Sequence, residues 1–156
     1  MSKIDISKLT PRTGSGYPSP YDVEMGDRGV IALGDAGGLS QFGVNLVILQ
    51  PGAKSSMRHW HMKQDEFAMV TEGQLVLIED DGETMLHPGD CMAWPAGVEN
   101  GHQLVNRSDA EARFLVVGTR TDEEVGYYSD VDMMVTQKDG VMRFTKRDGT
   151  LLKEVK

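Results

Sequence analysis

The sequence predicts an all-β protein, and three observations lead to this prediction. Its 156 residues include 18 glycines and 6 prolines, a mixture that favours short strands joined by tight turns. From residue 30 onward, short runs rich in β-branched and aromatic residues alternate with Gly, Pro, Asn and Asp. No segment keeps helical periodicity beyond about two turns. Regular strand spacing of this kind is typical of a sandwich or a barrel, within one domain.

The first 29 residues differ in composition from the rest of the chain. The stretch "TPRTGSGYPSPYD" is rich in prolines and glycines, which helices and paired strands do not tolerate. We expect residues 1–29 to form an arm that lies over the body, with Tyr17 and Tyr21 as anchors. A partly disordered tail is the alternative.

Residues 30–120 are predicted to form the barrel as a succession of strands. The expected strands are "VIAL", "FGVNLVILQ", "KSSMRHWH", "DEFAMVTEG", "QLVLIED", "ETML", "CMAWP", "HQLVNR" and "EARFLVVGTR". The segment "GDAGGLSQ" is expected to be a loop.

Residues 121–156 are predicted to form an extension that packs on the barrel. It begins with "TDEEVGYY", the segment that most favours a short helix or turn. A hairpin is expected around Asp139-Gly140 and a second turn at Asp148-Gly149.

Charge and cysteine content indicate which partners are excluded and which cellular compartment is expected. The net charge of -8 and the pI near 4.9 argue against nucleic acid or an anionic membrane as a partner. No run of eighteen apolar residues exists, and the N-terminus lacks the apolar core of a signal peptide. Cys91 is the single cysteine, expected to be a small buried side chain, so no intrachain disulfide can form. These features predict a cytoplasmic protein.

The segment "RHWHMKQDEFAMVTEG", residues 58–73, gathers metal-donor side chains at the start of a predicted strand. Residues two apart in a strand project to the same side, so His59 and His61 point together and Trp60 points away. Glu66 follows after a gap that allows a tight turn and the start of the neighbouring strand. His102 opens the strand "HQLVNR" and could supply a fourth donor.

Three imidazoles and one carboxylate suit one divalent transition metal such as Zn, Fe, Mn or Ni better than calcium or magnesium. Four protein ligands on an octahedral ion would leave two positions for water or a substrate. A bare His-x-His pair also occurs by chance on exposed strands, so spacing alone leaves both interpretations open.

Several neighbouring residues have a structural interpretation beside the functional one. Asp65 alternates with Glu66 and is expected to be a turn or cap residue, and His87 is expected in an exposed loop. Trp94 could pack in the core or line the mouth of the barrel. By strand parity, three more side chains could border the pocket: Met57, Leu104 and Asn106.

Two stretches resemble the conserved motifs of the cupin family. "PGAKSSMRHWHMKQDEFAMVTEG" is similar to the first motif at His59, His61, Glu66 and Gly73, with Gly52 one residue further upstream than is usual. "GDCMAWPAGVENGHQLVN" is similar to the second motif, although the gap before His102 is two residues longer. Its matching positions are Gly89, Pro95, Gly97, His102 and Asn106. The resemblance to small single-domain bacterial cupins, sometimes labelled sugar-phosphate isomerase-like, covers roughly residues 30–150.

The resemblance implies a double-stranded β-helix, a jelly-roll barrel whose mouth holds the metal on His59, His61, Glu66 and His102. It also implies a homodimer, for which the outward-facing Trp60 and Arg58 are candidate contacts. No residue offers itself as a nucleophile, so chemistry would depend on the metal.

Two functions remain open. One is a metal-dependent isomerase, lyase or dioxygenase acting on a sugar, sugar acid, hydroxy acid or keto acid, and the other is a non-catalytic small-molecule binder or sensor. An acidic pocket would disfavour polyanionic substrates, although net charge does not fix the local field.

Overall fold

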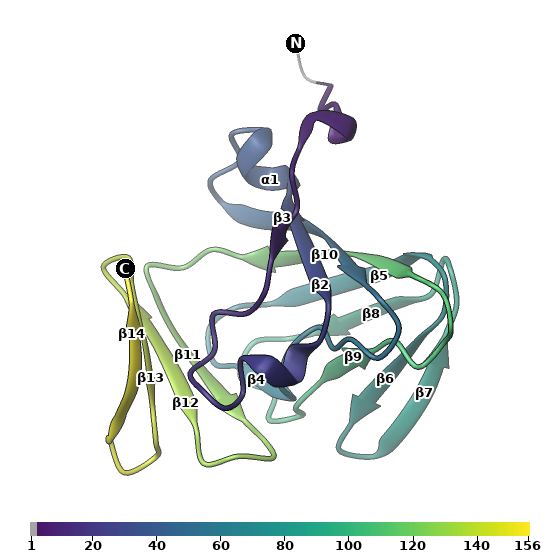
Figure 1. Cartoon of the computed structure of the whole chain (residues 1–156). Helices are drawn as coiled ribbons and strands as arrows, with labels where there is room; N and C mark the ends of the chain where they lie inside the picture. The colour runs from purple at the N-terminus through teal and green to yellow at the C-terminus, as the bar shows by residue number, and fades with distance from the viewer. Residues whose placement is uncertain (1–2) are drawn as a thin grey trace.

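The computed structural model describes residues 3–156, which fold almost entirely into strands (Figure 1). The strands are β1 (Arg12–Thr13), β2 (Arg28–Ala32), β3 (Phe42–Leu49), β4 (His59–His61), β5 (Glu66–Glu72), β6 (Leu75–Glu79), β7 (Gly82–Leu86), β8 (Cys91–Trp94), β9 (Gln103–Val105), β10 (Ala112–Thr119), β11 (Glu123–Tyr128), β12 (Met134–Lys138), β13 (Val141–Thr145) and β14 (Leu151–Val155). Three short helices accompany them: η1 (Ile6–Lys8), η2 (Val23–Met25) and α1 (Leu33–Ala36). The all-β prediction is confirmed.

Three antiparallel sheets build a jelly-roll barrel and its extension. The largest has the strand order β1-β2-β3-β10-β5-β8, and a smaller one has the order β7-β6-β9. Their inner faces share one core, in which Leu49 and Val70 of the first sheet and Leu75 and Leu104 of the second are almost fully buried. Burying such side chains is worth about 1.5–3 kcal/mol each, which holds the two sheets together.

A tight turn at Gly73 joins β5 to β6 and thereby connects the two sheets of the barrel. The residue has φ 74°, and a Cβ there would lie 2.6 Å from the carbonyl oxygen of Glu111 and 2.8 Å from Cα of Ala112. Only glycine fits this approach and this dihedral angle. The motif glycine noted in the sequence therefore has a purely structural role.

The third sheet joins the C-terminal extension to the barrel. Its order is β14-β13-β12-β11-β4, so the histidine-bearing strand forms one of its edges. The expected hairpin at Asp139-Gly140 is confirmed, since both residues have positive φ and link β12 to β13. The turn at Asp148-Gly149 is also confirmed, between β13 and β14.

The predicted helix or turn at "TDEEVGYY" is wrong, because residues 123–128 form β11. Its buried side alternates with period two through Glu124, Gly126 and Tyr128. Backbone pairing with β4 and β12 on both sides overrides a weak local preference. The expected loop "GDAGGLSQ" contains one helical turn, α1.

The described part of the N-terminal segment packs on the body, and residues 1–2 of it lie outside the described residues. β1 pairs with β2, and the Tyr17 ring packs edge-on against Tyr128 and Phe144 at centroid distances of 5.5 and 5.7 Å. Tyr21 packs on the same cluster. Figure 1 shows the arm running in front of the barrel, between β2 and the C-terminal sheet. Within residues 3–156, no helix has the length and apolar character needed to cross a membrane.

Candidate metal centre

Strand β4 presents His59 and His61 on the same side, as the alternation predicts. Their Nε2 atoms lie 3.2 Å apart. The strand is held by pairing with β11 and by a bridge in which the backbones of His59 and His102 exchange two hydrogen bonds of 3.2 and 2.9 Å. Nδ1 of His59 lies 2.9 Å from the carbonyl oxygen of Met57, so this nitrogen donates and Nε2 keeps a lone pair for a ligand.

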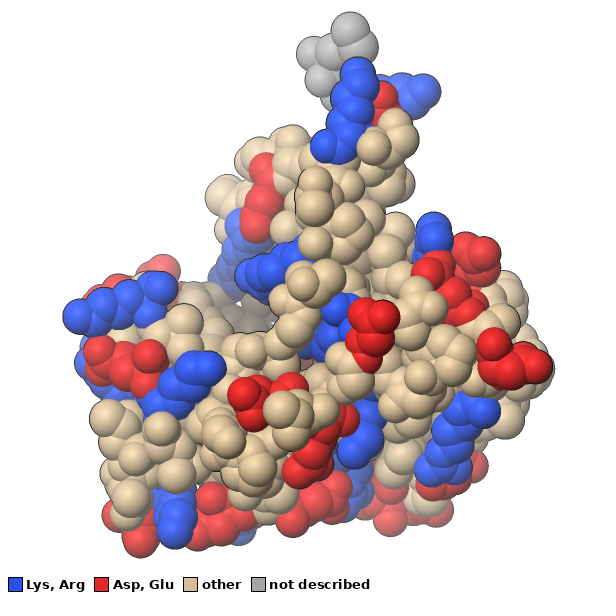
Figure 2. Space-filling model, viewed as in Figure 1, with Lys and Arg blue, Asp and Glu red and all other residues tan. Residues whose placement is uncertain are grey.

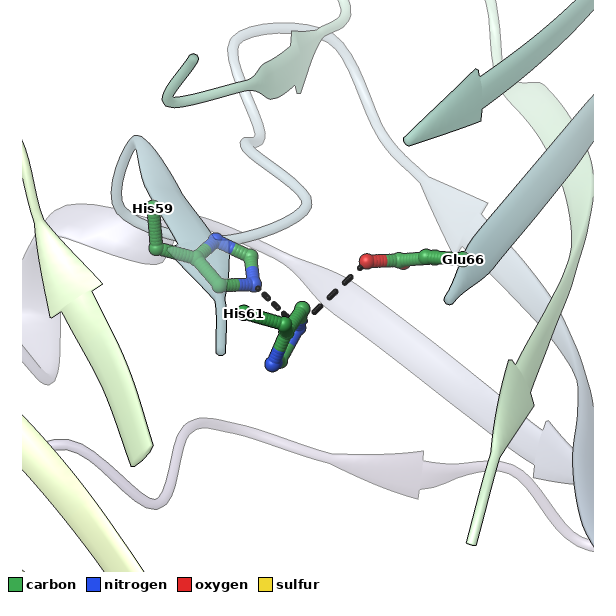
Figure 3. Close-up of side chains that lie close together, drawn as sticks. All are labelled: His59, His61 and Glu66. Atoms are coloured by element: carbon green, nitrogen blue, oxygen red, sulfur yellow. Dashed lines mark hydrogen bonds and ion pairs between the residues drawn. The ribbon is translucent and has the colours of Figure 1, made fainter. Parts of the chain in front are cut away.

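Glu66 is the first residue of β5 and points toward the two histidines (Figure 3). Its Oε2 lies 3.5 Å from Nε2 of His61, and the donor atoms of His59, His61 and Glu66 all lie within 4.8 Å of one another. The structure corrects the expectation that Glu66 arrives on the strand next to β4. β5 belongs to the six-stranded sheet and β4 to the five-stranded one, so the cluster bridges two sheets.

The buried carboxylate of Glu124 holds the corner between these two strands. It accepts hydrogen bonds from the backbone N–H groups of Met62 and Lys63, at 2.8 and 3.1 Å, and from its neighbour Val125. Sequence reasoning missed this role because a carboxylate in "TDEEVGYY" gives no sign of its distant partner. Its place on the buried side of β11 follows from the sheet pairing, so the sequence alone carries no signal for it.

His102 joins the cluster through Glu66, and the longer loop before it does not displace it. Its Nε2 lies 3.1 Å from Oε2 of Glu66, and its ring centroid lies 5.0 Å from that of His59. The Trp94 ring stacks on it at 3.9 Å with an angle of 10°. The indole N–H of Trp94 in turn donates to Glu79 at 2.8 Å, which holds the Trp94 ring in place. The His102 ring is therefore held by Glu66 at its Nε2 and by Trp94 on its face.

Burial and mutual contacts set the protonation of the cluster. Burial, assisted by the neighbouring His102, lowers the pKa of His59 to about 4, so its ring is neutral near pH 7. Burial alone would raise the pKa of Glu66, but hydrogen bonds from His102 and His61 outweigh it and hold that pKa well below its ordinary value. Burial opposes protonation of His61 too, yet the contact with Glu66 leaves its pKa raised.

This donor set fits a transition metal. Two imidazole nitrogens and an ionised carboxylate oxygen, from His59, His61 and Glu66, lie within 4.8 Å of one another, and His102 adds a third imidazole through its contact with Glu66. Such a combination suits Zn, Fe, Mn or Ni. Nδ1 of His61 and of His102 is buried without a hydrogen-bond partner in the described residues, which leaves the Nε2 sides as the ones engaged.

Among the cavities that residues of the cluster line, two contain His59. An inner one of about 170 Å³ lies within the barrel and is lined by His59, Glu66 and His102 together with Trp94 and Leu104. A second, of about 530 Å³, lies between the arm, β4 and the C-terminal sheet. Leu104 lines the pocket, as expected. Trp94 both packs against the hydrophobic core and lines the inner cavity, so both interpretations of this residue hold.

The other residues considered in the sequence have structural roles. Asp65 accepts a hydrogen bond from the backbone of Ala96 at 2.8 Å, and His87 is exposed, both as predicted. Asn106 does not border the pocket: it is fully buried beyond the end of β9 and donates to the carbonyls of Leu49 and Ala110. Cys91 is exposed rather than buried, because β8 is an edge strand and Met92 takes its inner side.

Two further residues at these cavities, Arg12 and Arg28, were missed by sequence reasoning. The division at residue 29 placed them in an arm of coil, whereas both lie in strands, β1 and β2. Arg28, Val30 and Ala32 are spaced two apart in one strand and so share a face. This shared face is the signal that could have revealed a cation pointing toward the cavities.

A jelly-roll barrel with a His-x-His pair and a glutamate at its mouth is the architecture of a cupin. A sequence profile of the cupin domain matches residues 45–118, and that range contains all four residues of the cluster. With the relative described next, this shows that the chain belongs to the cupin superfamily.

Among solved structures, a protein from Silicibacter pomeroyi DSS-3 described as a sugar phosphate isomerase of the cupin superfamily is 60% identical. The match covers 97% of this chain and 96% of that one, with a TM-score of 0.94. A provisionally assigned sugar phosphate isomerase from Acidithiobacillus ferrooxidans is 24% identical, with 92% and 88% coverage and a TM-score of 0.82.

The polyketide cyclase RemF from Streptomyces resistomycificus is 20% identical, with 76% and 79% coverage and a TM-score of 0.63. The last two similarities show a shared fold. Among functionally curated proteins, no significant sequence match was found.

Proposed function

We propose that this protein is a metal-dependent enzyme that isomerises a small oxygen-rich molecule of the sugar phosphate class. The observation that carries the proposal is the meeting of donor atoms from His59, His61 and Glu66 within 4.8 Å at the mouth of the barrel. The description of the 60% identical relative supports isomerisation over the lyase and dioxygenase chemistry that the sequence leaves open.

His59, His61 and His102 would hold one divalent ion through their Nε2 atoms, with Glu66 as the fourth ligand. When bound, the ion would act as a Lewis acid that stabilises negative charge developing on substrate oxygens. The chain's own contribution is to fix the ligands: Met57 orients the His59 ring, and Trp94 orients the His102 ring. The apolar side chains of the inner cavity would exclude water from the bound substrate.

A second candidate, non-catalytic binding, is supported by the acid–base inventory of the two cavities. Apart from the four cluster residues, the titratable side chains that line them in the described chain are Arg12, Arg28, Tyr17 and Tyr128. Burial raises the pKa of both tyrosines, so they keep their protons near pH 7. No separate general base is therefore at hand, and proton transfer would have to use Glu66 or an imidazole.

Metal analysis followed by a proton-exchange assay separates these functions. The protein is purified without chelator, saturated in turn with zinc, manganese, iron(II) and nickel, and incubated with aldose and ketose phosphates in D₂O. An isomerase incorporates deuterium next to the carbonyl carbon and interconverts the two sugars. His59→Ala and His102→Ala should abolish exchange and reduce metal content, whereas the exposed His87→Ala should retain both.

Binding without deuterium exchange would favour the sensor function. Metal content and turnover that are unchanged in His59→Ala and His102→Ala would overturn the proposal of a metal centre at this site.

A further inference from the structure

Two arginines near the metal centre have no acidic partner. Five of the eight arginines form ion pairs with carboxylates, and Arg147 donates to the backbone carbonyl of Tyr128. Within residues 3–156, the side chains of Arg12 and Arg28 make neither a hydrogen bond nor an ion pair. Arg28 is half-buried, a position in which an arginine is usually paired, whereas Arg12 is exposed.

The sheet register places both arginines on the side of β1 and β2 that faces the cavities. Arg12 lies opposite Val30 across the β1–β2 pair, and Arg28 lies two residues before Val30 on the same strand. Val30 lines the inner cavity, so the two arginines share its side of the sheet. Both of them line the inner cavity beside His59 and also the larger pocket under the arm.

Arg28 is held there at an energetic cost. Its Nε is buried without an acceptor, and burial, with the nearby charge of Arg12, lowers its pKa. A cation removed from water without a counter-ion is unfavourable. The whole chain is acidic, with a net charge of -8, but the cavities are not. Glu66 is the one carboxylate among the described residues that line these two cavities. Figure 2 shows blue side chains beside the hollow that the arm crosses.

We propose that Arg12 and Arg28 bind the phosphoryl group of a phosphorylated ligand, whose remaining atoms extend toward His59 and Glu66. A phosphomonoester carries about -1.5 to -2 charge near pH 7, which matches two guanidinium groups. A carboxylate carries one charge and would leave one arginine uncompensated. The hydroxyl groups of Ser55 and Ser56 line the same cavities and can donate to further oxygens.

This inference replaces the expectation that an acidic pocket disfavours polyanions, because the local charge at the cavities is opposite to that of the whole chain. The second half of the proposal, the direction of the ligand toward the metal centre, rests on the proposed function. The phosphoryl site itself does not require a metal.

Calorimetric titration of the full-length protein tests the site with defined probes. Inorganic phosphate, glucose 6-phosphate, gluconate and glucose are titrated into the metal-free and the zinc-loaded protein. Glucose 6-phosphate should bind to both forms at least about tenfold more tightly than gluconate or glucose, as expected for an added charge-assisted pair. Arg28→Gln and Arg12→Gln should each weaken phosphate and glucose 6-phosphate about tenfold or more.

The matched control is Arg107→Gln, an arginine paired with Glu83 on the exposed surface, which should bind like the wild type. If Arg28→Gln does not fold, the more exposed Arg12→Gln carries the test by itself. Unchanged phosphate affinity in Arg12→Gln overturns the site, and gluconate binding as tightly as glucose 6-phosphate overturns the phosphoryl assignment.

Zinc content measured in the same samples separates the two proposals. Arginine-dependent phosphate binding in a protein that takes up no zinc would contradict the proposed function and leave the phosphoryl site standing. Zinc uptake without arginine-dependent phosphate binding would contradict the phosphoryl site and leave the proposed metal centre standing.

Discussion

At the scale of a single residue, we expect Arg28 to lower the stability of the ligand-free protein. Because its Nε is buried without an acceptor and no counter-ion lies beside this half-buried side chain, replacing it with an apolar side chain of similar length should stabilise the ligand-free protein. We expect Arg28→Met to raise the free energy of unfolding by about 1 kcal/mol or more, measured by urea denaturation in phosphate-free buffer.

The matched comparison is Arg58, whose guanidinium is paired with Asp80 and Asp130 at 2.5 and 2.7 Å. Arg58→Met should lower stability, because it removes charge-assisted hydrogen bonds. A loss of stability in Arg28→Met as large as that in Arg58→Met would show that Arg28 has a partner within the protein.

His59 makes the metal-free protein sensitive to mild acid. Its pKa is about 4 in the folded chain and 6.5 ordinarily, so the unfolded chain binds more protons in between, and stability falls as the pH drops below 6.5. His61 has a raised pKa, and its contribution is complete below 6.5 and is lost as the pH rises above that value. From pH 7 to 5 we expect His59 to cost about 2 kcal/mol, measured by urea denaturation.

The neutral replacement His59→Gln provides the control for this pH dependence. It should show a smaller loss of stability over the same interval, because no imidazole remains to be protonated at this position. Equal slopes for the two proteins would contradict the buried, neutral state of His59.

At the scale of elements, the site depends on the corner that joins β4 to β5 across two sheets. Oε1 of Glu124 accepts from the backbone N–H groups of Met62, Lys63 and Val125, and Oε2 also accepts from Lys63. In a glutamine, an NH₂ group takes the place of one of these oxygens and meets a backbone N–H instead of accepting from it. Glu124→Gln should therefore destabilise the protein by about 1–3 kcal/mol and weaken metal binding about tenfold. Zinc titration and urea denaturation measure the two effects.

The adjacent Glu123→Gln is the matched control, since Glu123 makes exposed ion pairs with Lys63 and Lys138. Such pairs are worth about 0–1 kcal/mol, so this variant should behave like the wild type. If both variants bind zinc like the wild type, the corner does not position the ligands.

Alternation within one strand is the part of the site that the sequence could predict. It placed His59 and His61 together, and it separated Glu66 from Asp65, because period two is a local property of extended backbone. It failed for Asn106, which lies one residue past the end of β9, where parity no longer applies. It failed for β11 because pairing with strands distant in the sequence decided its conformation.

At the scale of the whole molecule, the barrel was predictable from strand spacing and motifs, but the strand pairing by which the arm joins it was not. Residues 12–13 and 28–29 read as coil in the sequence, yet they complete the six-stranded sheet and bring Arg12 and Arg28 to the cavities. This pairing is formed between segments separated by a proline- and glycine-rich stretch, which local propensity does not reveal.

The homodimer implied by the family resemblance stays a prediction. Trp60 stacks on Tyr127 within the chain, whereas Phe42 and Phe67 lie exposed on the outer side of the six-stranded sheet, next to a pocket of about 470 Å³. We expect sedimentation to give twice the chain mass and Phe67→Asp to give a monomer that still binds zinc. A monomeric wild type at micromolar concentration would contradict this expectation.

Anomalous diffraction from crystals of the metal-loaded protein tests most directly whether His59, His61, Glu66 and His102 share one ion. With data collected on both sides of the metal's absorption edge, we predict a single strong peak within about 2.0–2.3 Å of the three Nε2 atoms and a carboxylate oxygen. Well-ordered crystals of protein with bound zinc that show no peak at this position would contradict the metal centre.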